Sequence, residues 1–152
     1  MKIGDTLPNF SAKTDNDILV TDETYKSGKV VFYFYPKDDT PGCTKEACDF
    51  RDSFEAYKQA GITVVGISKD GSVSHKKFKD KYNLPFTLIT DEEADMCKKF
   101  EIWGEKSFMG KVFLGINRAT FLVVDGKIKH IWHNVKVNGH VEEVLKMAKD
   151  FT

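Results

Sequence analysis

Two apolar runs of strand length, separated by one segment of helical length, constrain the fold of this chain more than any other feature. The first run, "KVVFYFYP", starts at Lys29 and is bounded by Gly28 and Pro36, and the second, "ITVVGIS", covers residues 62–68. Continuous apolar runs of this length are typical of strands that are covered on both faces of a sheet. The order strand, helix, strand requires a crossover connection, so the two strands are predicted to lie parallel.

The segment between the two runs predicts one helix of roughly twenty residues. Its start is "DDTPG", where Thr40 is expected to be the N-cap and Pro41 occupies the first helical position, at which a missing N–H costs nothing. Gly61 offers a left-handed stop. Apolar side chains recur every three or four residues in between, at Ala47, Phe50, Phe54 and Tyr57.

The remaining chain continues the alternation. "SVSHKKFKDKYN" and "EEADMCKKFEIW" predict helices, "FTLIT" a strand, and "GHVEEVLKMAKD" a closing helix. "ATFLVV" and "KIKHIWH" predict a hairpin around Asp125-Gly126, and "NFSAKTDNDILVTD" a smaller N-terminal hairpin at a sheet edge. "WGEKSFMGKVFLGINR" is expected to be a loop. We expect one α/β domain over residues 1–152, with a central mixed sheet flanked by helices.

Composition and charge exclude several classes of partner and location. The chain has 23 acidic and 23 basic residues, so no summed field draws it to nucleic acid or to an anionic membrane surface. The N-terminus lacks the apolar core of a signal peptide, and no apolar run is long enough to span a bilayer. A cytoplasmic protein is therefore expected. In a reducing compartment its three cysteines favour a transient disulfide over a structural one.

Cys43 lies just beyond the carboxyl end of the first long strand, in the first turn of the following helix. Ligands of open α/β sheets bind at this edge. Free backbone N–H groups and the positive end of the helix dipole there favour a thiolate, which is a nucleophile. The alternative, a small apolar residue that fills space, is common for isolated cysteines, but it does not explain why Thr40, Pro41 and Gly42 shape a tight turn around the sulfur.

A second cysteine, Cys48, follows five residues later. A zinc site is disfavoured because the other candidate ligands are scattered among separate predicted elements, and the C-x-x-C motif of thioredoxin-type exchange is absent. On a continuous helix the two Cα atoms lie roughly 8 to 9 Å apart on different faces. A disulfide requires less than about 7 Å, so any bond between them requires the helix to unwind. A small, buried, purely structural Cys48 remains an equal alternative.

A reactive thiol with a second thiol nearby in sequence is typical of a redox cysteine, which is oxidised to sulfenic acid and then captured as a disulfide. Acyl transfer by Cys43 would instead require a histidine base with an orienting partner. The four histidines lie in no recognisable partner motif. The sequence therefore favours redox chemistry and leaves hydrolysis without support.

The segment "YPKDDTPGCTKEACDFRD" resembles the active-site segment of the peroxiredoxins, and specifically of the bacterioferritin comigratory protein (PrxQ) subfamily. The motif P-x-x-x-T-x-x-C, here Pro36, Thr40 and Cys43, is specific. "GDTLPNF", "SHKKFKDKYNLPF", "WGEKSFMGK", "INRATFLVVDGKI" and "VKVNGHVEEVLK" resemble further parts of the subfamily in the same order. The resemblance covers nearly the whole chain and implies a thioredoxin-like fold with an N-terminal hairpin. Cys97 departs from the usual pattern.

The resemblance also implies roles for individual residues. Cys43 corresponds to the peroxidatic cysteine, and Arg118 to the arginine that completes the site. Alternatively, Arg118 is a solvated residue at the start of a strand, which is the more common environment of an arginine. Thr40 would bond the peroxide or thiolate, a role that competes with capping for one oxygen. Pro36 would shield the site from water. Glu46 would orient the arginine, or would be a solvated acid in the first turn.

Cys48 matches the resolving cysteine of subfamily members that form a disulfide within this helix. The implied reaction reduces hydrogen peroxide or an organic hydroperoxide, and an external dithiol, most often thioredoxin, restores the enzyme. No cofactor or metal is implied, and the subfamily favours a monomer. A terminal helical turn is a unit of low stability, so its opening in each cycle is feasible.

Two alternatives to this cycle stay open. Cys43 could be the only catalytic thiol, resolved by an external thiol or by Cys97. The protein could instead be a redox-controlled holdase or binding module, in which oxidation unwinds the helix and exposes Phe50 or Phe54. The segment from Trp103 to Lys111 is expected to pack over the core, with Phe108 and Met109 partly exposed to a peroxide pocket.

Overall fold

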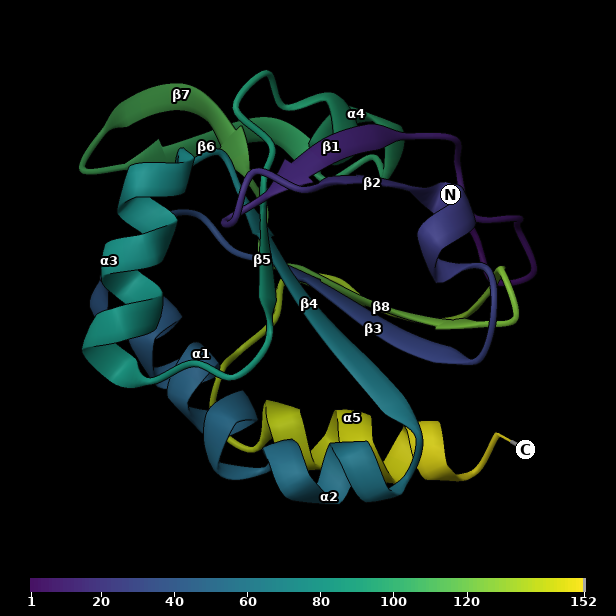
Figure 1. Ribbon diagram of the computed structural model, residues 1–152. Coiled ribbons are helices and arrows are strands. Elements are labelled where there is room, and N and C mark those ends of the chain that lie inside the picture. The colour runs from purple at the N-terminus through teal and green to yellow at the C-terminus, as the bar shows by residue number, and fades with distance from the viewer. Residues whose placement is uncertain (152) are drawn as a thin grey trace.

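A computed structural model describes residues 1–151 (Figure 1). Seven strands form one mixed sheet in the order β2-β1-β5-β4-β3-β8-β9, and β6 and β7 form a separate two-stranded sheet. The strands are β1 Ser11–Thr14, β2 Leu19–Thr21, β3 Lys29–Phe34, β4 Ile62–Ser68, β5 Thr87–Thr90, β6 Trp103–Phe108, β7 Lys111–Ile116, β8 Ala119–Val124 and β9 Lys127–Trp132. The helices are α1 Pro41–Asp52, α2 Phe54–Gln59, α3 Ser72–Tyr82, α4 Asp95–Lys99 and α5 His140–Lys149, with a 3₁₀ turn at Asp22–Tyr25.

The central strand β3 is buried on both faces, as its continuous apolar sequence predicts. It pairs parallel with β4 and antiparallel with β8, which confirms both the crossover and the mixed sheet. Alternate side chains of β3 enter two separate cores. One core lies under α1, α2, α3 and α5, and the other lies under α4 and the N-terminal segment (Figure 1).

Both predicted hairpins are present. The strands β1 and β2 pair antiparallel at one edge of the large sheet. At the other edge β8 and β9 are joined by Asp125 and Gly126, which have φ angles of 48° and 78°. Two consecutive residues with positive φ make the turn that matches the twist of a two-residue hairpin, and glycine accepts this conformation without strain. Within residues 1–151 no helix is long and apolar enough to cross a membrane.

The prediction of one helix of about twenty residues is wrong in one respect. The segment is helical, but Ser53 divides it into α1 and α2. Ser53 has φ −99° and ψ 4°, although its N–H still bonds the carbonyl of Asp49 and its own carbonyl accepts from Tyr57. Serine has a low helical propensity since its side chain competes for backbone partners, so a break there costs little. Both cysteines of interest lie before the break.

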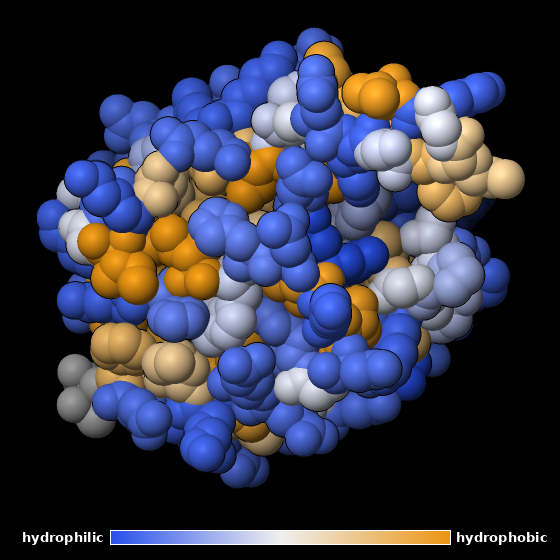
Figure 2. Space-filling model, turned by 180° about the vertical axis from the view of Figure 1, so that it is seen from behind, coloured by the Kyte–Doolittle hydropathy of each residue, from blue (hydrophilic) through white to orange (hydrophobic). Residues whose placement is uncertain are grey.

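The prediction of a loop between Trp103 and Arg118 is also wrong. This segment forms the β6–β7 hairpin, which turns at Met109 and Gly110. The hairpin projects from the body of the molecule, so both of its faces meet solvent and its sequence lacks the alternation that predicts a strand (Figure 1). Phe108 and Met109 are 68% and 86% exposed, so the expectation that they pack over the core is wrong. Figure 2 shows apolar side chains gathered on this projection, at the upper right.

Candidate active site

Sheet register brings Cys43 and Arg118 to the same edge of the large sheet. In the antiparallel pair of β3 and β8, Phe34 lies opposite Ala119. Helix α1 begins shortly after β3 ends, and Arg118 directly precedes β8. A cysteine at the start of α1 and an arginine 75 residues later are therefore neighbours. The sequence predicts the position of each, but only the register places them together.

The guanidinium group of Arg118 bonds two side chains of α1. Its Nη2 donates to Sγ of Cys43 at 3.2 Å, and its Nη1 donates to Oε1 of Glu46 at 2.6 Å. Cys43 and Glu46 are three residues apart and therefore share one face of the helix. A β-carbon at Gly42 would lie 3.3 Å from Nη2, so glycine at this position leaves room for the arginine. The expected association of Cys43, Glu46 and Arg118 is present in the geometry.

The carboxyl group of Glu46 is fully buried, so it is not the solvated acid that the alternative interpretation expected. Burial raises the pKa of Glu46 to about 7, against the charge and hydrogen bond of Arg118, which lower it. Burial lowers the pKa of Arg118, but Glu46 and Cys43 outweigh it and the net shift is upward. Among residues 1–151, Oε2 of Glu46 and the hydroxyl of Tyr33 are the two buried side-chain polar atoms without a partner. The site thus holds one fixed cation between a sulfur atom and an acid that ionises close to neutral pH.

Thr40 occupies the N-cap position of α1, with φ −100° and ψ 155°. The predicted capping bond is wrong, however, because its hydroxyl donates to the carbonyl oxygen of Lys37 at 2.9 Å. A hydroxyl that has given its hydrogen to a carbonyl keeps its lone pairs as acceptors. Thr40 can therefore accept a hydrogen bond from a peroxide without giving up a helix cap.

Pro36 lines a pocket of about 210 Å³ between the end of β3 and the β6–β7 hairpin. The other lining residues are Lys69, Trp103, Lys106, Phe113, Leu114, Gly115 and Ile116. Nζ of Lys106 donates to the carbonyl of Ile116 at 2.7 Å. Burial and then the charge of Arg118 lower the pKa of Lys106, while Cys43 raises it. Lys106 is a second cation near the sulfur that the sequence did not reveal, because its segment was expected to be a loop.

The other two cysteines differ in their environment. Cys48 also lies in α1 and is partly exposed, and burial raises the pKa of its thiol. Cys97 is fully buried in the core on the opposite face of the sheet from Cys43, and burial raises its pKa strongly. All three thiols are free. A direct bond between Cys43 and Cys97 would have to cross the sheet, so the geometry disfavours Cys97 as a resolving thiol.

A buried polar cluster lies beside the loop that precedes α1. Nδ1 of His75 bonds Oδ2 of Asp38 at 2.7 Å, and Nε2 bonds the carbonyl oxygen of Ile89 at 2.9 Å. Because both partners are acceptors, both ring nitrogens donate, so His75 is an imidazolium paired with Asp38. Asp38, Asp70 and His75 are close enough to hold a metal ion. Their converging atoms already serve hydrogen bonds within the protein, which accounts for the cluster as a structural network.

This ion pair predicts a pH-dependent stability. Burial lowers the pKa of His75, but the Asp38 carboxylate and the Ile89 carbonyl outweigh it and raise the pKa above 6.5. The ion pair's contribution to the free energy of unfolding is fully present below the unfolded-state pKa of histidine, about 6.5. It is lost as the pH rises through the pKa of His75 in the folded protein. We expect His75→Gln to lower the free energy of unfolding by about 3 kcal/mol near pH 6 and by clearly less near pH 9. Urea unfolding of both proteins measures this, and a difference that does not depend on pH would contradict the imidazolium.

Comparison with known proteins gives a consistent result. Residues 3–131 match the profile of the AhpC/TSA family. The chain is 47% identical to the putative peroxiredoxin bcp of Coxiella burnetii over 146 residues, which cover 95% of this chain and 97% of the relative. It is 43% identical to peroxiredoxin Bcp of Bacillus subtilis over 153 residues, which cover 100% and 98%.

Solved structures agree with these sequence matches. PrxQ of Xylella fastidiosa superposes with a TM-score of 0.92 at 38% identity and covers 98% of this chain and 96% of its own. The bacterioferritin comigratory protein of Xanthomonas campestris, a protein with alkyl peroxide reduction activity, superposes with a TM-score of 0.88 at 34% identity and covers 95% and 98%. The thioredoxin-like peroxiredoxin fold implied by the sequence is confirmed.

Proposed function

The chain belongs to the AhpC/TSA family and, within it, to the Bcp/PrxQ peroxiredoxins, and from this premise we propose that Cys43 is the peroxidatic cysteine of this thiol-dependent peroxidase. One observation carries the assignment, namely the 3.2 Å hydrogen bond from Nη2 of Arg118 to the sulfur of Cys43. A partly buried guanidinium that donates a hydrogen bond to sulfur favours the thiolate. Neither Cys48 nor Cys97 has an arginine hydrogen bond of this kind within residues 1–151.

In the first step the Cys43 thiolate attacks the terminal oxygen of the hydroperoxide. The S–O bond forms as the O–O bond breaks, which oxidises the sulfur to sulfenic acid and releases an alkoxide or hydroxide that takes a proton from solvent. Arg118 is fixed by Glu46, so its N–H groups can bind the oxygen on which negative charge develops without reorganising during the reaction. Thr40 accepts a hydrogen bond from the peroxide, and Pro36 limits the access of water.

In the second step Cys48 attacks the Cys43 sulfenic acid, forms the disulfide and releases water. Both cysteines lie in the intact helix α1, where their Cα atoms are roughly 8 to 9 Å apart by helical geometry. A disulfide requires a shorter separation, so the first turns of α1 must open between the two steps. The buried Cys97 on the other face of the sheet stays outside the cycle.

The remaining assignments extend this mechanism to substrates and partners. We propose hydrogen peroxide and organic hydroperoxides as substrates, because the small pocket beside Pro36 joins apolar side chains with Lys69 and Lys106. An external dithiol, thioredoxin or a similar protein, reduces the disulfide. The protein is proposed to act as a cytoplasmic monomer in which residues 1–152 form one domain. Balanced charge supports independence from nucleic acid and membranes.

Thiol mapping after a single oxidation tests this function. The reduced protein is treated with one equivalent of hydrogen peroxide, its free thiols are alkylated, and its peptides are identified by mass. We expect a cross-link between Cys43 and Cys48, with Cys97 alkylated only after unfolding.

Other products would point to the alternatives. Cys43 in the sulfinic form with Cys48 still alkylatable would overturn the assignment of Cys48 and support a one-cysteine mechanism. Negligible peroxide consumption with increased binding of an apolar dye on oxidation would support the binding module instead, since Phe50 is fully buried in the reduced protein.

A further inference from the structure

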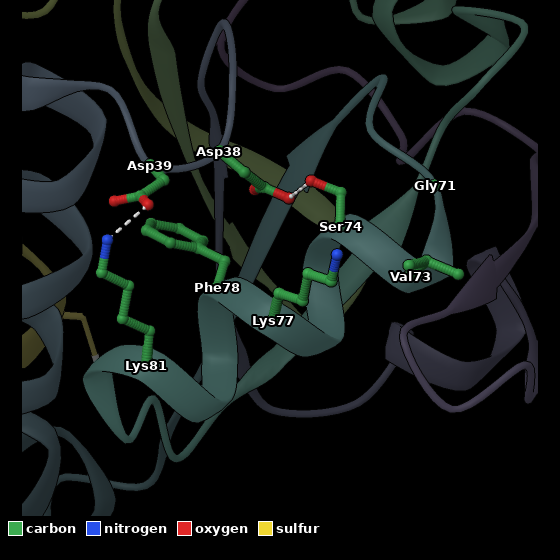
Figure 3. Close-up of a pocket in the computed structure, with 8 residues that line it drawn as sticks. All are labelled: Asp38, Asp39, Gly71, Val73, Ser74, Lys77, Phe78 and Lys81. Carbon is green, nitrogen blue, oxygen red and sulfur yellow. Dashed lines mark hydrogen bonds and ion pairs between the residues drawn. The ribbon is translucent and has the colours of Figure 1, made fainter.

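Two consecutive aspartates, Asp38 and Asp39, connect the loop before α1 to opposite ends of α3. Asp38 bonds Ser74 and His75 in the first turn of α3, and Asp39 bonds Lys81 and Tyr82 in its last turn. Figure 3 shows Asp38 with Ser74 and Asp39 with Lys81 on either side of Phe78, along a pocket of about 660 Å³. This loop leads directly into the turn that carries Cys43.

The attachment through Asp38 is buried and fully bonded. Its Oδ1 accepts from the hydroxyl of Tyr35 at 2.6 Å, and its Oδ2 accepts from Ser74 at 2.8 Å and from His75 at 2.7 Å. Its backbone N–H donates to Oδ2 of Asp70 at 2.8 Å. Breaking a buried ion pair leaves uncompensated charges in a medium of low dielectric constant, which is strongly unfavourable. This side of the loop is therefore expected to stay attached while α1 opens.

The attachment through Asp39 is different because it lies at the surface. Nζ of Lys81 donates to Oδ2 at 2.8 Å and the hydroxyl of Tyr82 donates to Oδ1 at 2.7 Å, while the hydroxyl of Thr44 approaches Oδ1 at 3.5 Å. Exposed polar contacts exchange readily with water. Thr44 belongs to the first turn of α1, where its N–H bonds the carbonyl of Thr40. Opening this turn separates Thr44 from both Thr40 and Asp39.

We propose that Asp39 is a positioning residue whose bonds to Lys81 and Tyr82, here called the latch, hold the first turn of α1 in its helical position and can break. Asp38 keeps the preceding loop attached to α3 while that turn opens. The latch sets how often the Cys43 sulfenic acid leaves the closed site and meets Cys48. The latch thereby determines what fraction of the sulfenic acid follows each of two reactions. Attack by the Cys48 thiol gives the disulfide and water, whereas attack on a second hydroperoxide breaks its O–O bond and gives the sulfinic acid and an alcohol or water. This inference rests on the proposed function of Cys43 and Cys48.

Two substitutions release the latch without touching the site. Tyr82→Phe removes one hydroxyl, and Asp39→Asn removes the charge while keeping a residue type that tolerates the φ of 54°. Lys77→Met is the matched control, because Lys77 lines the same pocket one turn before Lys81, and no hydrogen bond or ion pair of its amino group is found within residues 1–151. We expect both latch variants to form the disulfide about three- to tenfold faster than the parent chain.

The ratio of disulfide to sulfinic acid, measured by intact mass over a series of peroxide concentrations, provides a second readout. The peroxide concentration that converts half of Cys43 to sulfinic acid is expected to rise by the same factor. The second-order rate constant of the first oxidation should stay within about twofold of the parent value, since the contacts of Arg118 are unchanged. A variant that merely loosened the fold would slow this first step as well.

Amide exchange in the oxidised protein locates the fixed side of the hinge. The N–H of Asp38, which bonds Asp70, should remain protected, whereas the N–H of Thr44 should exchange freely. Loss of protection at Asp38 would overturn the hinge, and parent-like rates of disulfide formation in both latch variants would overturn the latch. If no disulfide between Cys43 and Cys48 forms even in the parent chain, the proposed function fails instead, so the two failures are distinguishable.

Discussion

Replacing Cys48 with serine is expected to leave the first reaction with peroxide intact and to abolish turnover supported by a dithiol protein. Cys43 is on the buried face of α1 and accepts a hydrogen bond from Arg118, whereas Cys48 is partly exposed and, within residues 1–151, makes no hydrogen bond to that arginine. Its removal leaves the thiolate and Arg118 in place but leaves the sulfenic acid without an internal thiol. Steady-state turnover with thioredoxin should fall roughly 100-fold or more, to the rate at which external thiols reach Cys43. Stopped-flow mixing measures the first step, and a coupled NADPH assay measures the cycle.

Cys97→Ala is the matched control for this experiment. Cys97 is a free, fully buried thiol in the other core, so its removal should change neither the first step nor the recycled turnover. Sulfinic acid at Cys43 should accumulate in the Cys48 variant under repeated peroxide additions and not in the Cys97 variant. Slowed first oxidation in Cys48→Ser would contradict the division of roles, and lost recycling in Cys97→Ala would restore Cys97 as a candidate for resolution.

Local sequence patterns predict the part of the site that one segment builds. The apolar run of β3 and the signals around Thr40 and Pro41 place Cys43 at a helix start on the binding edge of the sheet. The spacing to Cys48 then predicts the conformational change. The position of Cys43 at the start of α1 is confirmed, because it depends on residues that are neighbours in the sequence, whereas the conformational change stays a prediction.

Contacts between distant segments could not be predicted in this way. Arg118 meets Cys43 only through the register of β8 on β3, and the resemblance to a family, not the pattern of residues, pointed to it. Asp38 and His75 form an ion pair across 37 residues, which no periodicity reveals. The β6–β7 hairpin escaped prediction because a strand that is exposed on both faces lacks an alternating pattern.

Charge balance at the site follows from these distant contacts. Arg118 bonds both Cys43 and Glu46, so two buried groups that can carry negative charge share one partly buried cation. Glu46 loses its proton close to neutral pH, since burial raises its pKa to about 7. Below that pH the positive charge of Arg118 acts mainly on the sulfur and on the bound peroxide. The orientation of Arg118 persists in both states, because either form of the acid retains an acceptor oxygen.

Replacing Arg118 with methionine is therefore expected to lower the rate constant of the first oxidation by about 10²- to 10³-fold, the usual loss when one fixed donor to a developing oxyanion is removed. Methionine keeps most of the apolar volume but supplies no hydrogen bond to Sγ and no charge. Stopped-flow fluorescence over a series of peroxide concentrations gives the constant. A loss of less than about tenfold would show that the helix start alone activates Cys43.

Glu46→Gln separates the orientation of Arg118 from the charge of its partner. The amide oxygen of glutamine can still accept a hydrogen bond from Nη1, so the first oxidation should slow by less than about tenfold.

The free energy of unfolding of the Glu46→Gln variant, relative to the parent chain, should also change with pH in a specific direction. Because the folded pKa of Glu46 is raised from 4.5 to about 7, its contribution is fully present below pH 4.5 and is lost as the pH rises through 7. Glutamine has no such loss, so the free energy of unfolding of the variant relative to the parent should increase by about 3 kcal/mol between pH 4.5 and pH 8. Urea unfolding at both pH values measures the change, and a relative stability that stays constant would show that Glu46 ionises normally and that the charge of Arg118 fully offsets its burial.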